Sequence, residues 1–201
     1  EQQNFANWFA YYRTRRLSSI AGITKAFFDQ PDDMRIGYYA LNSDNNRGVR
    51  GFSGDDRDAF FDWLQTSAVG GSTPLRTALD NIGQYYERTD DQGPWADDPG
   101  ASDGQSVDAF AECRQSFSIL MTDGYYGTDN PDPGNLDGEA GPVIEGPNGE
   151  SYQYTPTDPF QDDYADTLAD VAMNYWVRDL QPNVANRVPV EEDQHMPAFW
   201  Q

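Results

Sequence analysis

The sequence predicts one α/β domain whose sheet is mainly parallel and carries helices on both faces. Helix-like and strand-like hydrophobic patterns alternate along the 201 residues, and such alternation is typical of this fold class. The clearest strand-like segment, SFSILM, runs directly into Thr122-Asp123-Gly124, so a carboxylate stands where a buried strand would end. Aromatic residues make up 14% of the chain, which supports a folded core although the hydrophobic share is only 37%.

The first predicted element is a long amphipathic helix over residues 2–30. Phe5, Trp8 and Phe9 stand at helical spacing, and the apolar pattern continues over several turns before Pro31. A proline disfavours helical geometry in the residue before it, so the helix is expected to end there.

Two strands and a second helix follow. The segments MRIGYYAL (34–41) and RGVRGF (47–52) are largely apolar and are joined by the polar turn NSDNN, which predicts a pair of strands. Ser53 and the acidic residues behind it can cap a helix, which apolar residues at helical spacing extend to about Thr66.

The rest of the chain alternates between clear elements and acidic excursions. Helical periodicity predicts one helix that starts near Pro74 and another over 167–180. The regions of about 89–115 and 125–164 lose the pattern and are interpreted as loop insertions. The second insertion is expected to contain a small β-hairpin that turns at Pro147-Asn148-Gly149.

The charge of the chain argues against two classes of partner. With a formal charge of −21 and a pI near 4.1, the chain has no excess of positive charge to neutralise the phosphates of a nucleic acid. An anionic membrane surface is disfavoured for the same reason. No run of about eighteen apolar residues is present, so direct insertion into a membrane is not expected. The acidic bias is compatible with high salt, divalent cations or an extracellular setting, and equally with a plain solvated surface.

A candidate site follows from the rule that ligands of such sheets bind beyond the carboxyl ends of the strands. Asp123 would stand at one such end, and Gly124 would turn the backbone away from it. Thr73, in the loop GGSTP before a helix, could present its hydroxyl to the same crevice. Hydroxyl and carboxylate oxygens suit Mg²⁺ or Ca²⁺ better than zinc or copper. Two plainer interpretations stay open, with Asp123 as a turn residue and Thr73 or Ser72 as a helix N-cap.

These elements resemble a von Willebrand factor A domain. Its metal-ion-dependent adhesion site uses an Asp-x-Ser-x-Ser loop, a threonine before a helix, and the aspartate of a strand-end Thr-Asp-Gly. More narrowly, five blocks in family order are similar to the N-terminal domain of the PilC/PilY family, large proteins associated with the tips of bacterial type IV pili. The blocks are EQQNFANWFAYYRTRRL, GGSTPLRTAL, CRQSFSILMTDGYY, PNGESYQYTP and TLADVAMNYWVRDL.

The resemblance implies that Thr73 and Asp123 are two ligands of a metal site. The Asp-x-Ser-x-Ser loop does not occur in the 201 residues. Since this loop would precede the long first helix, either a first strand lies upstream of Glu1, with further strands after Gln201, or this member has lost the loop. Two protein ligands leave a hard ion mostly hydrated, so binding of Mg²⁺ or Ca²⁺ to this chain is predicted to be weak or absent.

The resemblance also implies a non-enzymatic module in pilus biogenesis, attachment to hosts or surfaces, and twitching motility. The expected partners are minor pilins or other pilus tip proteins, and a host or abiotic surface ligand whose acidic group completes the shell of the ion. The expected location is the cell surface at the pilus tip, after transit through the periplasm and outer membrane. A structural scaffold that caps the tip, with a vestigial metal site, is the alternative.

An enzymatic function has the least support in the sequence. A phosphatase-like nucleophile at Asp123 would want a second acid two residues later, where Tyr125 stands. His195, the single histidine, lies in a Pro- and acid-rich tail, which gives a catalytic relay little support. Cys113 is the only cysteine, so no disulfide can form within the chain.

Overall fold

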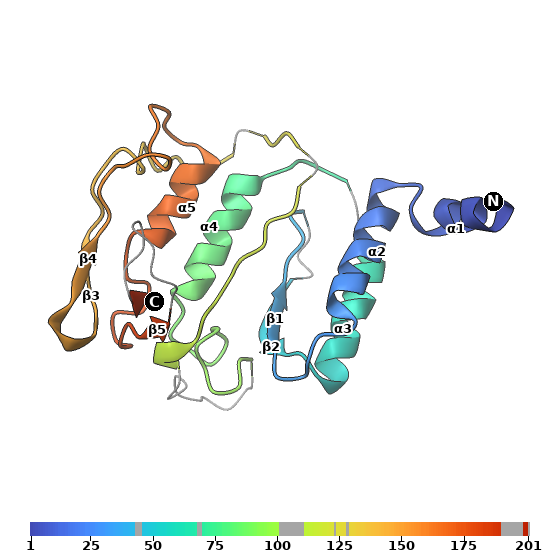
Figure 1. Ribbon diagram of the computed structural model, residues 1–201, viewed down its shortest axis with the longest axis horizontal. Helices are drawn as coiled ribbons and strands as arrows, with labels where there is room; N and C mark the ends of the chain where they lie inside the picture. Colours follow the sequence, from blue (N-terminus) through green and yellow to red (C-terminus); the bar gives the residue numbers. More distant parts are fainter. Residues whose placement is uncertain are drawn as a thin grey trace. The chain divides into compact units, whose positions relative to one another are not determined.

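A computed structural model gives the fold of the chain. The residues that it describes are 1–42, 46–67, 70–100, 111–122, 124–127, 129–189 and 199–200. The chain divides into two compact units, Glu1–Gly71 and Ser72–Gln201. Each unit has its own helices and strands (Figure 1) and is described by itself. No helix among the described residues is both long enough and apolar enough to cross a membrane.

The single N-terminal helix expected from periodicity is wrong, because the chain forms two helices, α1 (Gln2–Tyr11) and α2 (Arg15–Phe27). Tyr12 leaves helical geometry, with φ at −133°. Thr14 is the N-cap of α2, and its hydroxyl oxygen accepts a hydrogen bond from the Leu17 amide at 3.2 Å. A side-chain cap within a continuous apolar pattern therefore ends one helix and starts the next.

The aromatic side chains of α1 lie together on one exposed face. The ring of Phe5 lies 5.8 Å from that of Trp8 and 6.1 Å from that of Phe9, measured between centroids. Gln3 donates to the side chain of Asn7 at 2.9 Å, which places a polar pair elsewhere on the helix. None of the residues of α1 is buried. Because a helix of this length is marginal by itself in water, α1 depends on these local contacts.

The strand pair and the following helix of the first unit are confirmed. β1 (Arg35–Tyr38) and β2 (Arg47–Gly51) pair antiparallel, and α3 (Gly54–Thr66) follows them. Phe52 and Phe60 are buried, and their rings meet edge to face at 5.5 Å and 80°. An aromatic core between the hairpin and α3 therefore holds this unit.

The second unit is built around α4 (Leu75–Tyr86) and α5 (Leu168–Trp176), which lie side by side (Figure 1). Both predicted helices are confirmed, although α5 ends earlier than expected. Gly83 lets them approach, because a Cβ atom there would lie 2.4 Å from the ring of Tyr175. The Tyr175 hydroxyl donates to Asp80 Oδ1 at 2.6 Å. Burial, and next this hydrogen bond, raise the pKa of Tyr175 above its ordinary value.

The hairpin predicted around Pro147 is also confirmed. β3 (Val143–Glu145) and β4 (Ser151–Gln153) pair antiparallel and are joined by the 3₁₀ turn η2 (Pro147–Gly149). Asn148 and Gly149 have φ angles of 59° and 79°, a backbone conformation that asparagine and glycine adopt more readily than other residues. The turn chemistry of the sequence thus fixes the register of this hairpin.

The mainly parallel sheet stays a prediction. Every strand pair among the described residues is antiparallel and two-stranded, including β5 (Val188–Pro189) with β6 (Phe199–Trp200). The expected central strand at 116–121 is extended but is not assigned as a strand; it continues from the short turn η1 (Ala111–Cys113) and runs beside α4 (Figure 1). The Cys113 side chain is free and exposed.

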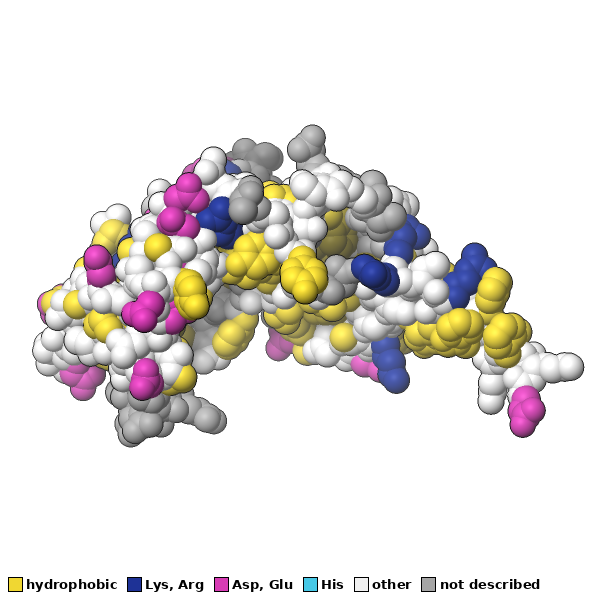
Figure 2. All heavy atoms as spheres, turned by 90° about the horizontal axis from the view of Figure 1, so that it is seen from above, with side chains coloured by type: hydrophobic (Ala, Val, Ile, Leu, Met, Phe, Trp, Pro, Cys, Tyr) yellow, Lys and Arg dark blue, Asp and Glu magenta, His cyan; other side chains and the backbone are white. Residues whose placement is uncertain are grey.

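The acidic charge belongs mainly to the second unit. Residues 1–71 carry nine acidic and eight basic side chains, whereas residues 72–201 carry twenty-five and five. Within the first unit, residues 2–28 contain four basic side chains and no acidic one. Figure 2 shows hydrophobic and basic side chains around α1 and α2, and acidic side chains spread over the part formed by residues 72–201. The electrostatic repulsion of anions is therefore a property of the second unit.

Candidate functional site

Thr73 lies directly before α4 and is half-buried. The expectation that Thr73 or Ser72 caps this helix is wrong, because Pro74 is the N-cap and no side chain at that position closes the first turn. The Thr73 carbonyl accepts from the Leu75 amide at 3.0 Å. Among the described residues the Thr73 hydroxyl has no hydrogen-bond partner, so it is available to a ligand.

Asp123, the second predicted site residue, lies outside the described residues, and so does His195. The residues around Asp123 are described. Gly124 has a φ of 143°, in the region that favours glycine, and its amide donates to Thr122 Oγ1 at 3.3 Å. The Gly127 amide donates to the Thr73 carbonyl at 3.1 Å. The turn that follows Asp123 therefore contacts the loop that carries Thr73.

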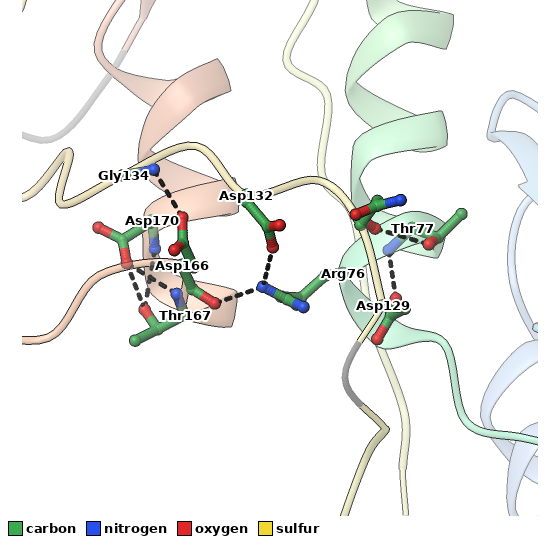
Figure 3. Close-up of polar contacts among 9 residues, drawn as sticks. Arg76, Thr77, Asp129, Asp132, Gly134, Asp166, Thr167 and Asp170 are labelled. Carbon is green, nitrogen blue, oxygen red and sulfur yellow. Dashed lines mark hydrogen bonds and ion pairs between the residues drawn. The ribbon is translucent and has the colours of Figure 1, made fainter.

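Sequence analysis missed Asp129, which caps α4 from a distant part of the chain. One carboxylate oxygen, Oδ2, accepts from the Thr77 amide at 2.8 Å, and the Thr77 hydroxyl donates to the Asn130 carbonyl at 2.6 Å (Figure 3). The other oxygen, Oδ1, is buried and has no partner among the described residues. No local pattern in the sequence could reveal this contact, because the two residues are 52 positions apart.

Arg76 contacts the same loop at Asp132, three residues after Asp129. Arg76 is only 7% exposed, and its Nη1 lies 3.0 Å from Asp132 Oδ1 and 2.6 Å from the Asp166 carbonyl oxygen (Figure 3). A guanidinium that is buried in this way needs charged or carbonyl acceptors, and the loop supplies both. Arg76 thus ties the loop after Asp123 to the segment that enters α5.

The N-terminus of α5 completes the attachment of this loop. Asp166 has a φ of 59° and accepts from the Gly134 amide at 2.8 Å. Thr167 and Asp170 form a capping box, in which Asp170 Oδ2 accepts from the Thr167 amide at 2.8 Å. The other oxygen of the fully buried Asp170 accepts from the Leu136 amide, also at 2.8 Å. Figure 3 shows the Gly134–Asp166 and Thr167–Asp170 contacts together with those of Arg76.

These acidic side chains act as caps and clamps. Helix N-termini favour negative charge, and the carboxylates of Asp129 and Asp170 each accept a hydrogen bond at one of them. Within the described part of the chain, no three acidic, histidine or cysteine side chains are grouped so that they could hold a metal ion. Of the two predicted ligands, Thr73 lies among the described residues and Asp123 does not.

Comparison with known proteins finds relatives for nearly the whole chain. It is 36% identical over 199 residues to the type IV pilus biogenesis factor PilY1 of Pseudomonas aeruginosa strain PAK, 35% over 202 residues to that of strain PAO1, and 33% over 195 residues to that of strain UCBPP-PA14. No family model matches the chain, and no solved structure matches it. The matches include 92–94% of this chain but only 16–17% of each relative. Residues 1–201 are therefore similar, along almost their entire length, to about one sixth of a type IV pilus biogenesis factor.

Proposed function

We propose that residues 1–201 are a non-enzymatic module of a larger protein that acts in type IV pilus biogenesis and attachment. The observation that carries this proposal is the similarity to three pilus biogenesis factors over 92–94% of the chain. The module would sit at the cell surface on the pilus tip, contact minor pilins or other tip proteins, and support twitching motility. As a control for the enzymatic alternative, we expect no turnover of generic phosphate or ester substrates, with or without Mg²⁺.

We further propose that Thr73 and Asp123 supply two oxygen ligands of a von Willebrand factor A-like adhesion site for Mg²⁺ or Ca²⁺. Two observations support this. The Thr73 hydroxyl is free among the described residues, and the Gly127 amide donates to the Thr73 carbonyl at 3.1 Å, so the loop after Asp123 returns to Thr73. The remaining positions around the ion would go to water, to further residues of the full-length protein, and to an acidic group of the partner.

Two protein oxygens are too few to hold a hard divalent ion tightly. Titration calorimetry of residues 1–201 with Mg²⁺ or Ca²⁺ is therefore expected to show weak binding or none. Tight binding that disappears in the Asp123→Ala variant would contradict this expectation, because it would mean that the 201 residues already contain a complete site.

The function itself is tested in the full-length protein, in cells that make type IV pili. Asp123→Ala is expected to reduce surface attachment, the display of pili, or both. Asp163→Ala is a matched control, because Asp163 is exposed and takes no part in the network of Figure 3. The proposal fails if Asp123→Ala leaves both attachment and pilus display at the level of the control.

A structural scaffold at the pilus tip is the second candidate, and the hydrogen bonds that attach residues 129–136 to α4 and α5 favour it. Asp129, Asp132 and Asp170 each have a carboxylate oxygen that accepts from a backbone amide or from Arg76, so these side chains contribute to the stability of the fold. If the scaffold is the whole function, breaking the Arg76 contacts should reduce pilus display, whereas Asp123→Ala should have no effect on attachment.

A further inference from the structure

The first turn of α4 is capped by a side chain from a distant loop. The N-cap residue is Pro74, whose side chain offers no hydrogen-bond acceptor. The amide of Thr77, the third residue of the helix, donates instead to Asp129 Oδ2 at 2.8 Å. In an ordinary cap the side chain of the N-cap residue accepts from the second or third amide of the helix. The Asp129 carboxylate therefore takes the place of an N-cap side chain, at the position of Pro74.

Thr73 belongs to the same end of the helix. It directly precedes the N-cap residue and is half-buried, and its hydroxyl has no hydrogen-bond partner among the described residues. Gly127, two residues before Asp129, donates its amide to the Thr73 carbonyl at 3.1 Å. The loop that carries Asp129 thus meets the chain at Thr73 and again at Thr77. All these residues lie in the second unit, so their contacts do not involve residues 1–71.

One oxygen of the Asp129 carboxylate is left over. Oδ2 accepts from the Thr77 amide (Figure 3), whereas Oδ1 is buried and has no partner among the described residues. A buried carboxylate oxygen without a partner is unfavourable, and in a native protein such an atom indicates a bound ion or water. Arg76, in the same turn of α4, contacts Asp132 and the Asp166 carbonyl. Capping therefore accounts for one oxygen of Asp129 and leaves the other unexplained.

The composition around Asp129 favours a cation as the missing partner. Residues 115–177 contain twelve acidic side chains and no lysine, arginine or histidine. This stretch therefore has no cationic side chain of its own to pair with Oδ1. Carboxylate and hydroxyl oxygens are the ligands that Mg²⁺ and Ca²⁺ prefer, and the Thr73 hydroxyl is the second such oxygen at this helix end.

We propose that Asp129 is a third ligand of the ion, beside Thr73 and Asp123, and that it binds the ion through Oδ1 while Oδ2 caps α4. This inference rests on the proposed ion site and adds a residue to it. The adhesion site that the chain resembles uses the Asp-x-Ser-x-Ser loop, the threonine and the strand-end aspartate, and Asp129 is none of these. Three oxygens are still fewer than the six or so that a hard divalent ion takes, so weak binding to residues 1–201 stays the expectation.

Asp129→Asn separates the two oxygens in the full-length protein. Asparagine caps helices as well as aspartate does, but its one carbonyl oxygen cannot serve the Thr77 amide and the ion together. In titration calorimetry with Mg²⁺, the Kd of this variant should be at least about tenfold weaker than that of the unaltered protein. Asp163→Asn is the matched control, because Asp163 is exposed, and it should leave the Kd unchanged.

Asp123→Ala in the same titration distinguishes this inference from the proposed ion site. If Asp123→Ala weakens Mg²⁺ binding and Asp129→Asn does not, the third ligand is wrong and the ion site stands. If neither variant changes the Kd, both proposals are wrong. Weaker binding in both variants, with Asp163→Asn unchanged, is the result that the third ligand requires.

Hydrogen exchange at residues 75–78 of the full-length protein distinguishes the ligand from the cap. In a chelator, exchange should be equal in the unaltered protein and Asp129→Asn, which keeps the cap, and faster in Asp129→Ala, which loses it. Mg²⁺ at about ten times its Kd should slow exchange about tenfold in the unaltered protein and only about twofold in Asp129→Asn. Equal slowing in these two proteins would overturn the proposal and leave Asp129 as a cap alone.

Discussion

Gly83 shows how a single residue sets the distance between two helices. A Cβ atom at this position would lie 2.4 Å from three atoms of the Tyr175 ring, which is closer than real contacts allow. Only glycine permits α4 and α5 to pack at this point without moving the ring. The requirement is one of space, because Gly83 is not among the glycines with a positive φ.

We predict that Gly83→Ala lowers the free energy of unfolding by about 1–3 kcal/mol, because the added methyl group overpacks the contact with Tyr175. Gly22→Ala is the control. Gly22 is also helical, but a Cβ atom there would meet nothing within 4 Å, so this change should be neutral or stabilise by up to about 1 kcal/mol. Urea unfolding of both variants measures the difference, and equal effects would refute the packing explanation.

Tyr175 makes the second unit sensitive to alkali. Its pKa is raised by burial and by the hydrogen bond to Asp80, and burial also raises the pKa values of Tyr152 and Tyr154. An unfolded tyrosine ionises near pH 10, so the contribution of Tyr175 to stability is complete below about pH 10. It is then lost as the pH rises towards the higher pKa of the folded state.

The free energy of unfolding should therefore fall as the pH rises above about 10, and this fall should be shallower in Tyr175→Phe. Chemical unfolding at a series of alkaline pH values, followed by tryptophan fluorescence, measures the slope. Tyr125→Phe should keep the full slope, because Tyr125 is exposed. An unchanged slope in Tyr175→Phe would show that another group causes the alkaline loss.

At the scale of elements, local signals in the sequence predicted most helices and the hairpin. Pro147-Asn148-Gly149 specified the turn between β3 and β4 because asparagine and glycine tolerate its positive φ angles. The apolar pattern around Thr14 predicted one helix where two exist, since periodicity does not register a cap that interrupts the backbone without changing the spacing.

The candidate site was predictable only where its contacts are local. Thr73 could be found from its place before a helix, and the structure shows that its hydroxyl does not cap that helix. The roles of Asp129 and Arg76 depend on partners that are 52 and 56 positions away, and no short pattern encodes such distances. The apolar run at 116–121 predicted a buried strand, but this segment is not assigned as a strand, and Phe117, Ile119 and Met121 are exposed.

The contact between Asp170, at the start of α5, and the loop that contains Leu136 gives a prediction at the scale of elements. Asp170→Ala removes the buried acceptor of the part-buried hydrogen bonds from the Leu136 and Thr167 amides, and should cost about 2–3 kcal/mol of unfolding free energy. Asp163→Ala should change it by less than about 0.5 kcal/mol, because Asp163 is exposed. Thermal or urea unfolding compares the two. Equal costs would mean that Asp170 is not an anchor of the loop.

At the scale of the whole molecule, the charge is unevenly distributed between the units. The second unit carries twenty-five acidic side chains against five basic ones, and the first unit carries nearly equal numbers. Thr73 and Asp123 belong to the second unit. An acidic group of a partner would therefore be repelled there, unless a cation lies between that group and the second unit. This electrostatic requirement is the physical reason to expect that attachment depends on divalent ions.

The most direct test is the attachment of piliated cells, measured with and without a chelator of divalent cations, for the unaltered full-length protein and for Asp123→Ala. Chelation is predicted to lower the attachment of unaltered cells to the level of the variant and to have no further effect on variant cells. Adding back Mg²⁺ or Ca²⁺ should restore attachment only in unaltered cells. If chelation lowers the attachment of both kinds of cell by the same factor, Asp123 does not hold the ion and the proposed site is wrong.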